Sequence, residues 1–339
     1  KSLTLTLDAA IQDRTEKIMA EVGAEYMPKS ASAIVMDPQT GKLLAVANWP
    51  RVDAGDLSGA PASAMTDQAT NFTYEPGSTF KAFTMAGALQ DHVVTPDTPF
   101  NLAPTIQVAD REIGEAHERG WETLTTSQIL AQSSNVGTIT IAQKLGKQRF
   151  ASWVKRFGFG QKTGVDLPGE ERGMVIPASK YSGSSIGNLP IGQGLLVTPM
   201  QLAQGYAAIA NGGVLRSPHI VDKVGGRPVP EPRGKRVMNA ATAAQLRTML
   251  AGVFEQGGTA AAVKVPGYTL AGKTGTANKI DPKTGNYSQE KYVASFIGFA
   301  PAAAPKLLIS VVVDEPKGDI YGGDVAAPAF GKIADFALP

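Results

Sequence analysis

Three short motifs in this chain carry side chains suited to acyl-transfer chemistry. The first, Ser78-Thr79-Phe80-Lys81, places a hydroxyl three residues before an amine. The second, Ser133-Ser134-Asn135, supplies a hydroxyl and an amide, and the third, Lys273-Thr274-Gly275-Thr276, supplies a cation beside two threonine hydroxyls. A hydroxyl becomes an effective nucleophile when a base lies within reach of its proton. In chain order, the motifs therefore indicate a nucleophile with its base, a proton relay and a clamp for a carboxylate.

The first pattern does not identify the nucleophile by itself, because S-x-x-K also begins at Ser152 and at Ser288. Pro76 and Gly77 break the structure before Ser78, and apolar residues then follow at helical spacing. This pattern predicts that Ser78 lies at a helix N-terminus, near free backbone N–H groups. Ser152 stands among core-like residues, and Ser288 is predicted to lie in a polar loop. Ser78 is therefore the candidate nucleophile.

The K-T-G pattern is also repeated, and here the predicted secondary structure separates the copies. Residues 268–276 predict a short strand that includes Lys273, and a substrate groove can run along such a strand. Small residues such as Gly275 leave room for a ligand against the backbone. Lys162 lies in a glycine-rich turn, and Lys283 lies in a predicted hairpin loop. The copy at Lys273 is therefore favoured.

Taken together, the motifs and their surroundings resemble the transpeptidase domain of a class B penicillin-binding protein, of the division or sporulation type. The three motifs have the order and spacing of that family. Ser133-Ser134-Asn135 is the only S-x-N sequence in the chain, and it follows a helix predicted from a Thr125/Gln128 capping box. The resemblance covers nearly the whole chain, through the segments Leu3–Asp8, Tyr74–Lys81, Ile191–Gly194, Thr198–Leu202, Asn211–Gly213 and Tyr321–Pro328.

The resemblance implies a role for each catalytic residue. Ser78 attacks a peptide carbonyl, and Lys81, one helical turn later, takes its proton. Lys81 can do so only if its pKa is lowered, and partial desolvation and the positive charge of Lys273 both act in that direction. Ser133 is expected to relay a proton to the leaving amine, and Asn135 is expected to hold the amide of the substrate.

The resemblance also implies the binding residues and the substrates. Thr274, Gly275 and Thr276 are expected to bind the substrate, with the two threonines at its terminal carboxylate. The backbone N–H groups of Ser78 and Thr276 are expected to form the oxyanion hole. The donor would be a peptidoglycan stem peptide ending in D-Ala-D-Ala, the acceptor would be an amine of a second stem, and β-lactam antibiotics would acylate Ser78. No cofactor and no metal ion are expected.

Composition is consistent with this interpretation without selecting it. A chain of 339 residues with 43% hydrophobic and 18% charged residues is an ordinary globular sequence with enough length for a large core. A net charge of +2 without a long basic run gives no indication of nucleic-acid binding. The chain has no Cys, so disulfides and thiolate metal sites are excluded.

The location follows from the resemblance alone. No apolar stretch of about 18 residues or signal peptide is recognised in the sequence. Proteins of this family carry an N-terminal membrane anchor and a pedestal domain, which we expect to be absent from this chain. We therefore expect an extracytoplasmic location, with a glycan polymerase and division proteins as partners of the parent protein.

The order of the predicted elements indicates an α+β fold, the penicillin-binding/β-lactamase-like transpeptidase fold, with an antiparallel sheet flanked by helices. We expect the first strands to pair with the last strands in one sheet. Residues 1–339 would then form one catalytic domain. Residues 1–77 and about 254–339 would form a sheet-containing subdomain, and about 78–253 a mainly helical one.

Several of these elements have sequence signals at their ends. Asp8 predicts the N-cap of a helix that Gly23 would close. The predicted strands span residues 2–7, 31–36, 42–47, 268–276, 292–300 and 306–314, and further helices begin at Thr198 and run over 326–336.

Four other functions remain open from the sequence. A D,D-carboxypeptidase would use the same residues with water as the acceptor. A serine β-lactamase would need a carboxylate that activates water, for which Glu170 or Glu171 is placed suitably in the sequence. Residues 183–187 fit the G-x-S-x-G nucleophile elbow, but the required strand before them and helix after them are not predicted. A non-catalytic penicillin-binding scaffold is the fourth possibility.

Overall fold

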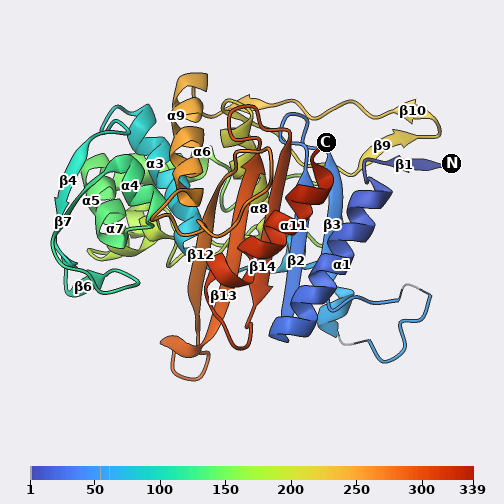
Figure 1. Ribbon diagram of the computed structural model, residues 1–339, viewed down its shortest axis with the longest axis horizontal. Helices are drawn as coiled ribbons and strands as arrows, with labels where there is room; N and C mark the ends of the chain where they lie inside the picture. The colour runs from blue at the N-terminus through green and yellow to red at the C-terminus, as the bar shows by residue number, and fades with distance from the viewer. Residues whose placement is uncertain (1, 54, 61) are drawn as a thin grey trace.

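A five-stranded antiparallel sheet forms the centre of the molecule (Figure 1). The computed structural model describes residues 2–53, 55–60 and 62–339. The strand order is β12-β13-β14-β2-β3, so two early strands join three late ones, as the sequence predicts. The strands are β2 (Ser30–Met36), β3 (Leu43–Trp49), β12 (Ala271–Ile280), β13 (Tyr287–Ala300) and β14 (Leu307–Asp314).

The alternation of side chains along the central strands separates two hydrophobic cores. On β14, Ile309, Val311 and Val313 face one core, whereas Leu308 and Val312 face the other. Figure 1 shows α1 (Ala9–Tyr26) and α11 (Ala327–Ala337) lying over the first face. The second face packs against α8 (Pro199–Ala210), which is buried along its whole length. Both faces of the sheet are covered, so its central strands are apolar on both sides.

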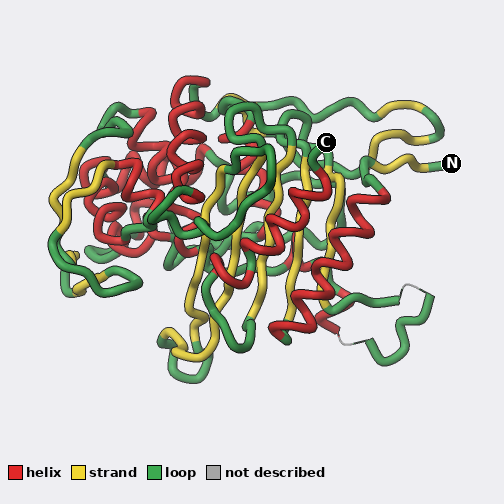
Figure 2. Tube along the Cα trace, in the orientation of Figure 1, coloured by secondary structure: helices red, strands yellow, loops and turns green. Residues whose placement is uncertain are grey.

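Most remaining helices lie beyond β12, the edge strand of the sheet, as Figure 2 shows. Their cores join the α8 side of the sheet in one continuous apolar cluster. These helices are α3 (Lys81–Gln90), α4 (Thr126–Ala131), α5 (Asn135–Leu145), α6 (Lys147–Arg156), α7 (Ser185–Asn188) and α9 (Ala240–Ala251), with the short α2 (Gln68–Asn71) and α10 (Gly322–Val325) elsewhere. The 3₁₀ turns are η1 (Ala62–Met65), η2 (Gly77–Phe80), η3 (Ala178–Lys180), η4 (Leu189–Ile191) and η5 (Gly252–Phe254).

The first strand does not join the central sheet, contrary to the prediction. β1 (Leu3–Leu5) pairs with β9 (Val221–Val224), which also pairs with β10 (Arg227–Pro228), in a separate sheet beside the N-terminus. All three residues of β1 are exposed, so this strand has no buried face to place against the central core. β9 and β10 form a short hairpin that turns at residues 225–226.

The first helix is longer than predicted, because Gly23 does not end it. α1 continues to Tyr26, and Met27, with φ of 41°, forms its left-handed cap. Gly23 is buried against β3, where an added Cβ would lie 2.2 Å from the Trp49 ring. The glycine therefore allows close helix-to-sheet packing and is not a cap. The Asp8 N-cap is confirmed, since its carboxylate accepts from the N–H groups of Ala10 and Ile11.

Short strands interrupt the mainly helical range, and none of them is predicted from the sequence. Two antiparallel strand pairs precede α4: β5 and β6 form a hairpin, and β4 pairs with β7 on either side of it in the chain. Each of these strands has four residues with at most two apolar residues on one face, a run too short for hydrophobic periodicity to identify it as a strand. The strands are β4 (Pro99–Leu102), β5 (Thr105–Val108), β6 (Arg111–Gly114), β7 (Glu122–Thr125), β8 (Val214–Leu215) and β11 (Lys235–Arg236).

Candidate active site

Ser78 lies in the 3₁₀ turn η2, immediately before α3, close to the predicted helix start. Side chains three residues apart lie over one another in a 3₁₀ turn, so Ser78 and Lys81 share a face. Two buried hydrogen bonds hold the turn: Thr79 Oγ1 donates to the Pro76 carbonyl over 2.8 Å, and the Tyr206 hydroxyl donates to the Thr79 carbonyl over 2.7 Å. The serine hydroxyl is thus presented from a rigid support.

The Lys81 side chain is fully buried, and its amine points to the second motif. Its Nζ donates to the Ser133 carbonyl over 2.6 Å and to Asn135 Oδ1 over 2.7 Å, and it lies 3.2 Å from Ser133 Oγ. Burial lowers the pKa of Lys81 to about 7, while the charge of Glu115 opposes this shift. A substantial fraction of the amine is therefore neutral near pH 7 and able to accept a proton.

The turn between α4 and α5 brings two polar side chains of the second motif to this amine. The predicted capping box is present at the start of α4, where the Thr125 and Gln128 side chains each bond the other's backbone. Ser133 then adopts φ of 63°, a left-handed conformation uncommon for serine, and Ser134 caps α5 by accepting from the Gly137 N–H. This reversal directs both Ser133 and Asn135 toward Lys81.

Lys273 is the second fully buried amine of the site. It lies on β12, and its Nζ contacts the Thr274 carbonyl oxygen at 3.2 Å and the Thr274 hydroxyl at 3.3 Å. Burial lowers the pKa of Lys273 well below its usual value, and repulsion from the charge of Lys81 lowers it further. The repulsion expected between the two amines therefore acts on Lys273, whereas desolvation is what lowers the pKa of Lys81.

Thr274 and Thr276 lie on one face of β12, since successive side chains of a strand alternate. The Thr274 hydroxyl is 2.7 Å from the Thr259 hydroxyl, and the Thr276 hydroxyl accepts from the Gly322 N–H over 3.1 Å. A Cβ built on Gly77 would lie 3.0 Å from the Thr276 carbonyl oxygen, so this carbonyl faces the Ser78 turn. In a strand the N–H and C=O of one residue point to the same side, so the Thr276 N–H also faces that turn.

The space beside Gly275 is filled by the protein, contrary to the expectation of room for a ligand. A Cβ there would lie 2.5 Å from Ser295 Oγ, 2.9 Å from Thr79 Cγ2 and 3.0 Å from the Pro76 carbonyl oxygen. Gly275 therefore allows the turn that carries Ser78 to pack directly on β12. The missing side chain serves the contact between the Ser78 turn and β12.

The other copies of the motifs lie apart from this cluster of contacts. Ser152 is on the exposed side of α6, between core residues as expected. Ser288 lies on β13 and not in a loop, because the hairpin strands extend farther than predicted; its hydroxyl accepts from two backbone N–H groups. Lys162 and Lys283 are exposed in a loop and a hairpin turn. Ser185 follows a turn and no strand, so the nucleophile elbow is absent there.

Glu170, the candidate carboxylate of a β-lactamase, accepts hydrogen bonds from its own loop. It is buried and accepts from the Thr163 N–H over 2.6 Å, from the Thr163 hydroxyl and from the Gly164 N–H. Glu171 is exposed. Both oxygens of the Glu170 carboxylate accept hydrogen bonds that close this loop, so the carboxylate has a structural role there.

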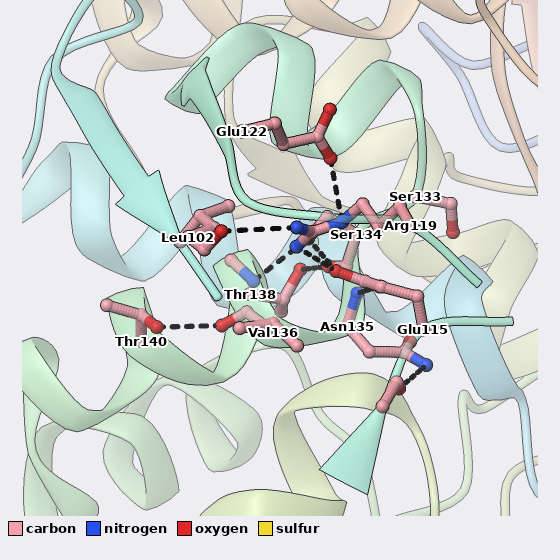
Figure 3. Close-up of polar contacts among 12 residues, drawn as sticks. Leu102, Glu115, Arg119, Glu122, Ser133, Ser134, Asn135, Val136, Thr138 and Thr140 are labelled. Carbon is pink, nitrogen blue, oxygen red and sulfur yellow. Dashed lines mark hydrogen bonds and ion pairs between the residues drawn. The ribbon is translucent and has the colours of Figure 1, made fainter. Parts of the chain in front are cut away.

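Sequence reasoning missed Glu115, which contacts the second motif (Figure 3). It follows β6 in the hairpin region, where no motif or periodicity marks it.

Within residues 2–53, 55–60 and 62–339, no group of three His, Asp or Glu side chains is arranged to hold a metal ion. Over the same described residues, no helix has the length and apolar character needed to cross a membrane.

Comparisons with known proteins agree with this fold and site. Residues 31–335 match the model of the penicillin binding protein transpeptidase domain. The chain is 36% identical to penicillin-binding protein PbpB of Mycolicibacterium smegmatis, over 99% of this chain and 54% of that protein. It is 36% identical to stage V sporulation protein D of Bacillus subtilis, over 99% of this chain and 53% of that protein.

A solved structure gives the same result in three dimensions. Penicillin binding protein 3 of Mycobacterium tuberculosis, complexed with aztreonam, superposes with a TM-score of 0.92 at 35% identity, covering 98% of this chain and 77% of that chain. The chain belongs to the penicillin-binding protein transpeptidase domain family, in its class B branch. It spans about half the length of the two sequence relatives named above.

Proposed function

We propose that this chain is a peptidoglycan D,D-transpeptidase that works through a Ser78 acyl-enzyme. The observation that carries the proposal is the buried Lys81 amine, which shares a face with Ser78 and bonds both Ser133 and Asn135. Burial makes this amine a base near neutral pH, which is the property that a serine nucleophile requires of its partner. The sequence relatives include a peptidoglycan D,D-transpeptidase of Escherichia coli at 35% identity.

The proposed reaction has two acyl transfers. Ser78 Oγ bonds to the carbonyl carbon of the penultimate D-Ala while its proton moves to Lys81 Nζ. The peptide C–N bond then breaks, and the leaving D-Ala amine receives a proton through Ser133. An amine of a second stem attacks the ester, loses its proton to the same base and releases Ser78, so the new peptide bond cross-links the stems.

The remaining residues would bind and polarise the donor. The N–H of Thr276 faces the nucleophile turn, so it and the N–H of Ser78 are suited to the oxyanion of the tetrahedral intermediate. The Thr274 and Thr276 hydroxyls share one face, with the Lys273 amine in contact with Thr274, and would receive the terminal carboxylate. Asn135 would hold the substrate amide.

The setting of the reaction is part of the proposal and rests on the family. The chain would act as one catalytic domain, with residues 1–77 and about 254–339 as the sheet-containing subdomain and about 78–253 as the mainly helical one. The parent protein would be anchored at the cell membrane and work on its outer side, together with a glycan polymerase and division proteins. β-Lactams would acylate Ser78, as the aztreonam complex of a relative suggests.

Exposure to benzylpenicillin followed by intact-mass measurement and peptide mapping tests the proposal. We expect one adduct of one penicillin mass, on the peptide that contains Ser78, and no adduct in Ser78→Ala. Ser152→Ala serves as the matched control and should label normally, because Ser152 lies on the far, exposed side of α6. An adduct on any other serine, or none in a folded protein, would contradict the assignment.

A further inference from the structure

A buried carboxylate supports the Ser133-Ser134-Asn135 turn from behind (Figure 3). Glu115 Oε1 accepts from the Ser134 hydroxyl over 2.6 Å, and its Oε2 accepts from the Asn135 N–H over 2.5 Å. The residue before it contributes as well, since the Gly114 carbonyl accepts from Asn135 Nδ2 over 3.0 Å. One short segment therefore fixes both the backbone and the side-chain amide of Asn135.

The amide contact sets the direction in which Asn135 faces. Because Nδ2 is bound by the Gly114 carbonyl, Oδ1 is the atom left to face Lys81, and it accepts from the amine over 2.7 Å. The Ser134 hydroxyl, held by Glu115, accepts from the Gly137 N–H and thereby caps α5. The left-handed backbone of Ser133 lies between these supports.

An ion pair fixes the carboxylate itself. Arg119 Nη2 lies 2.7 Å from Glu115 Oε1, and Arg119 Nε lies 2.7 Å from Glu122 Oε1. The Glu115 side chain is 8% exposed and that of Arg119 is 17% exposed, whereas Glu122 is 34% exposed. One guanidinium is shared between the two carboxylates, and the more buried of them, Glu115, is the one that contacts the second motif.

We propose that Glu115 is a positioning residue for acylation, which holds Ser133 and Asn135 against Lys81 and supplies a negative charge to the site. Glu115 contacts neither Ser78 nor a substrate, so it acts through the residues that do. This inference rests on the proposed transpeptidase function and adds a residue that none of the three sequence motifs contains.

The charged groups around Lys81 determine the direction in which Glu115 shifts the pKa of its amine. Lys273 faces it from β12, Glu115 acts from the segment after β6, and Arg119 stands behind Glu115, with Ser133 and Asn135 as the uncharged partners. Glu115 stabilises the ammonium form and so raises the pKa of Lys81 against the larger effect of burial. Removal of this charge should therefore extend the neutral form of Lys81 to lower pH.

The test compares Glu115→Gln, Glu115→Asp and Glu122→Gln with the parent, by the second-order rate of acylation with a fluorescent penicillin between pH 5 and 9. For Glu115→Gln we expect a rate about tenfold lower at high pH, because one of two carboxylate acceptors is lost, and an acid limb displaced about 0.5–1 unit to lower pH. Glu115→Asp keeps the charge but withdraws the carboxylate, so the limb should stay in place while the rate falls about threefold to tenfold. Glu122→Gln should change neither.

Each possible result decides the inference. The inference is overturned if the acid limb of the pH–rate profile of Glu115→Gln coincides with that of the parent. It is also overturned if Glu115→Gln loses no more of the acylation rate than Glu122→Gln does. If Glu115→Gln does not fold, a parent-like rate in Glu115→Asp overturns it instead. Titration of ¹³C-labelled lysine by NMR measures the pKa of the Lys81 amine directly and does not depend on acylation. A parent that fails to acylate therefore defeats the proposed function, while the shift in Glu115→Gln still decides the role of Glu115.

Discussion

At the scale of single residues, the site depends on two lysine amines that are both fully buried. A lysine in water is a poor base at pH 7 because its amine is protonated. Desolvation penalises the ammonium form of both amines, and the charge of Lys81 lowers the pKa of Lys273 further. The carbonyl and amide oxygens around Lys81 nevertheless accept its N–H groups, so its burial leaves no donor of this amine without a partner among the described contacts.

The pH dependence of acylation should report the Lys81 amine. As the proposed base, Lys81 would be active when neutral, and burial lowers its pKa to about 7, so the acylation rate should rise as pH rises through about 7. A single ionisation there gives about a tenfold increase from pH 6 to pH 8. Stopped-flow measurement with nitrocefin or a fluorescent penicillin checks this expectation.

The Lys81→Arg variant keeps a cation at every pH, so it should lose nearly all acylation. An acylation rate within tenfold of the parent would indicate that another residue is the base.

Glu170 offers a second prediction at this scale. Its carboxylate closes the turn at Thr163 and Gly164, so Glu170→Gln should lower the free energy of unfolding by about 1–3 kcal/mol. The lifetime of the penicillin adduct should stay within twofold of the parent, because this carboxylate is bound to backbone and hydroxyl donors of its own loop. Urea unfolding and the decay of the adduct measured by mass spectrometry test the two parts. Rapid turnover of nitrocefin that disappears in Glu170→Gln would instead identify a β-lactamase.

At the scale of elements, the site is the contact between an edge strand and a helical turn. Among the described residues, β12 pairs only with β13, so its other edge is free to meet η2. Gly77, with φ of 54°, and Gly275 allow this approach, since a Cβ on either would meet backbone atoms of the partner element at about 3 Å. The edge that a sheet would otherwise leave unpaired thus lies against the turn that carries Ser78.

The sequence predicted the elements that have strong local signals and missed those that depend on long-range packing. The three late strands, the β2–β3 hairpin, α8 and the capping box before α4 all follow from periodicity and caps. β1 was assigned to the wrong sheet, because pairing partners are not encoded in three exposed residues. Glu115 was missed for a related reason: its partners Ser134 and Asn135 lie about 20 residues away, and only the fold of the hairpins brings them together.

At the scale of the whole molecule, one sheet separates two cores with different relations to the site. The core under α1 and α11 contains Phe296 and Phe330, whose ring centroids are 4.7 Å apart. The other core contains Phe80, the last residue of η2, and Phe159, with centroids 5.0 Å apart. Only the second core directly supports the turn that carries Ser78, so equal losses of stability on the two sides should have unequal effects on acylation.

A matched pair of variants tests this division. Phe330→Leu and Phe159→Leu each remove part of a buried ring and should each lower the free energy of unfolding by about 1–2 kcal/mol, as measured with urea. Phe330→Leu should acylate within twofold of the parent, because its core lies across the sheet from η2. Phe159→Leu leaves space beside Phe80 and lets the nucleophile turn shift, so its acylation rate should fall about threefold to tenfold. Equal acylation rates in the two variants would contradict this division, because the two cores would then support the Ser78 turn to the same extent.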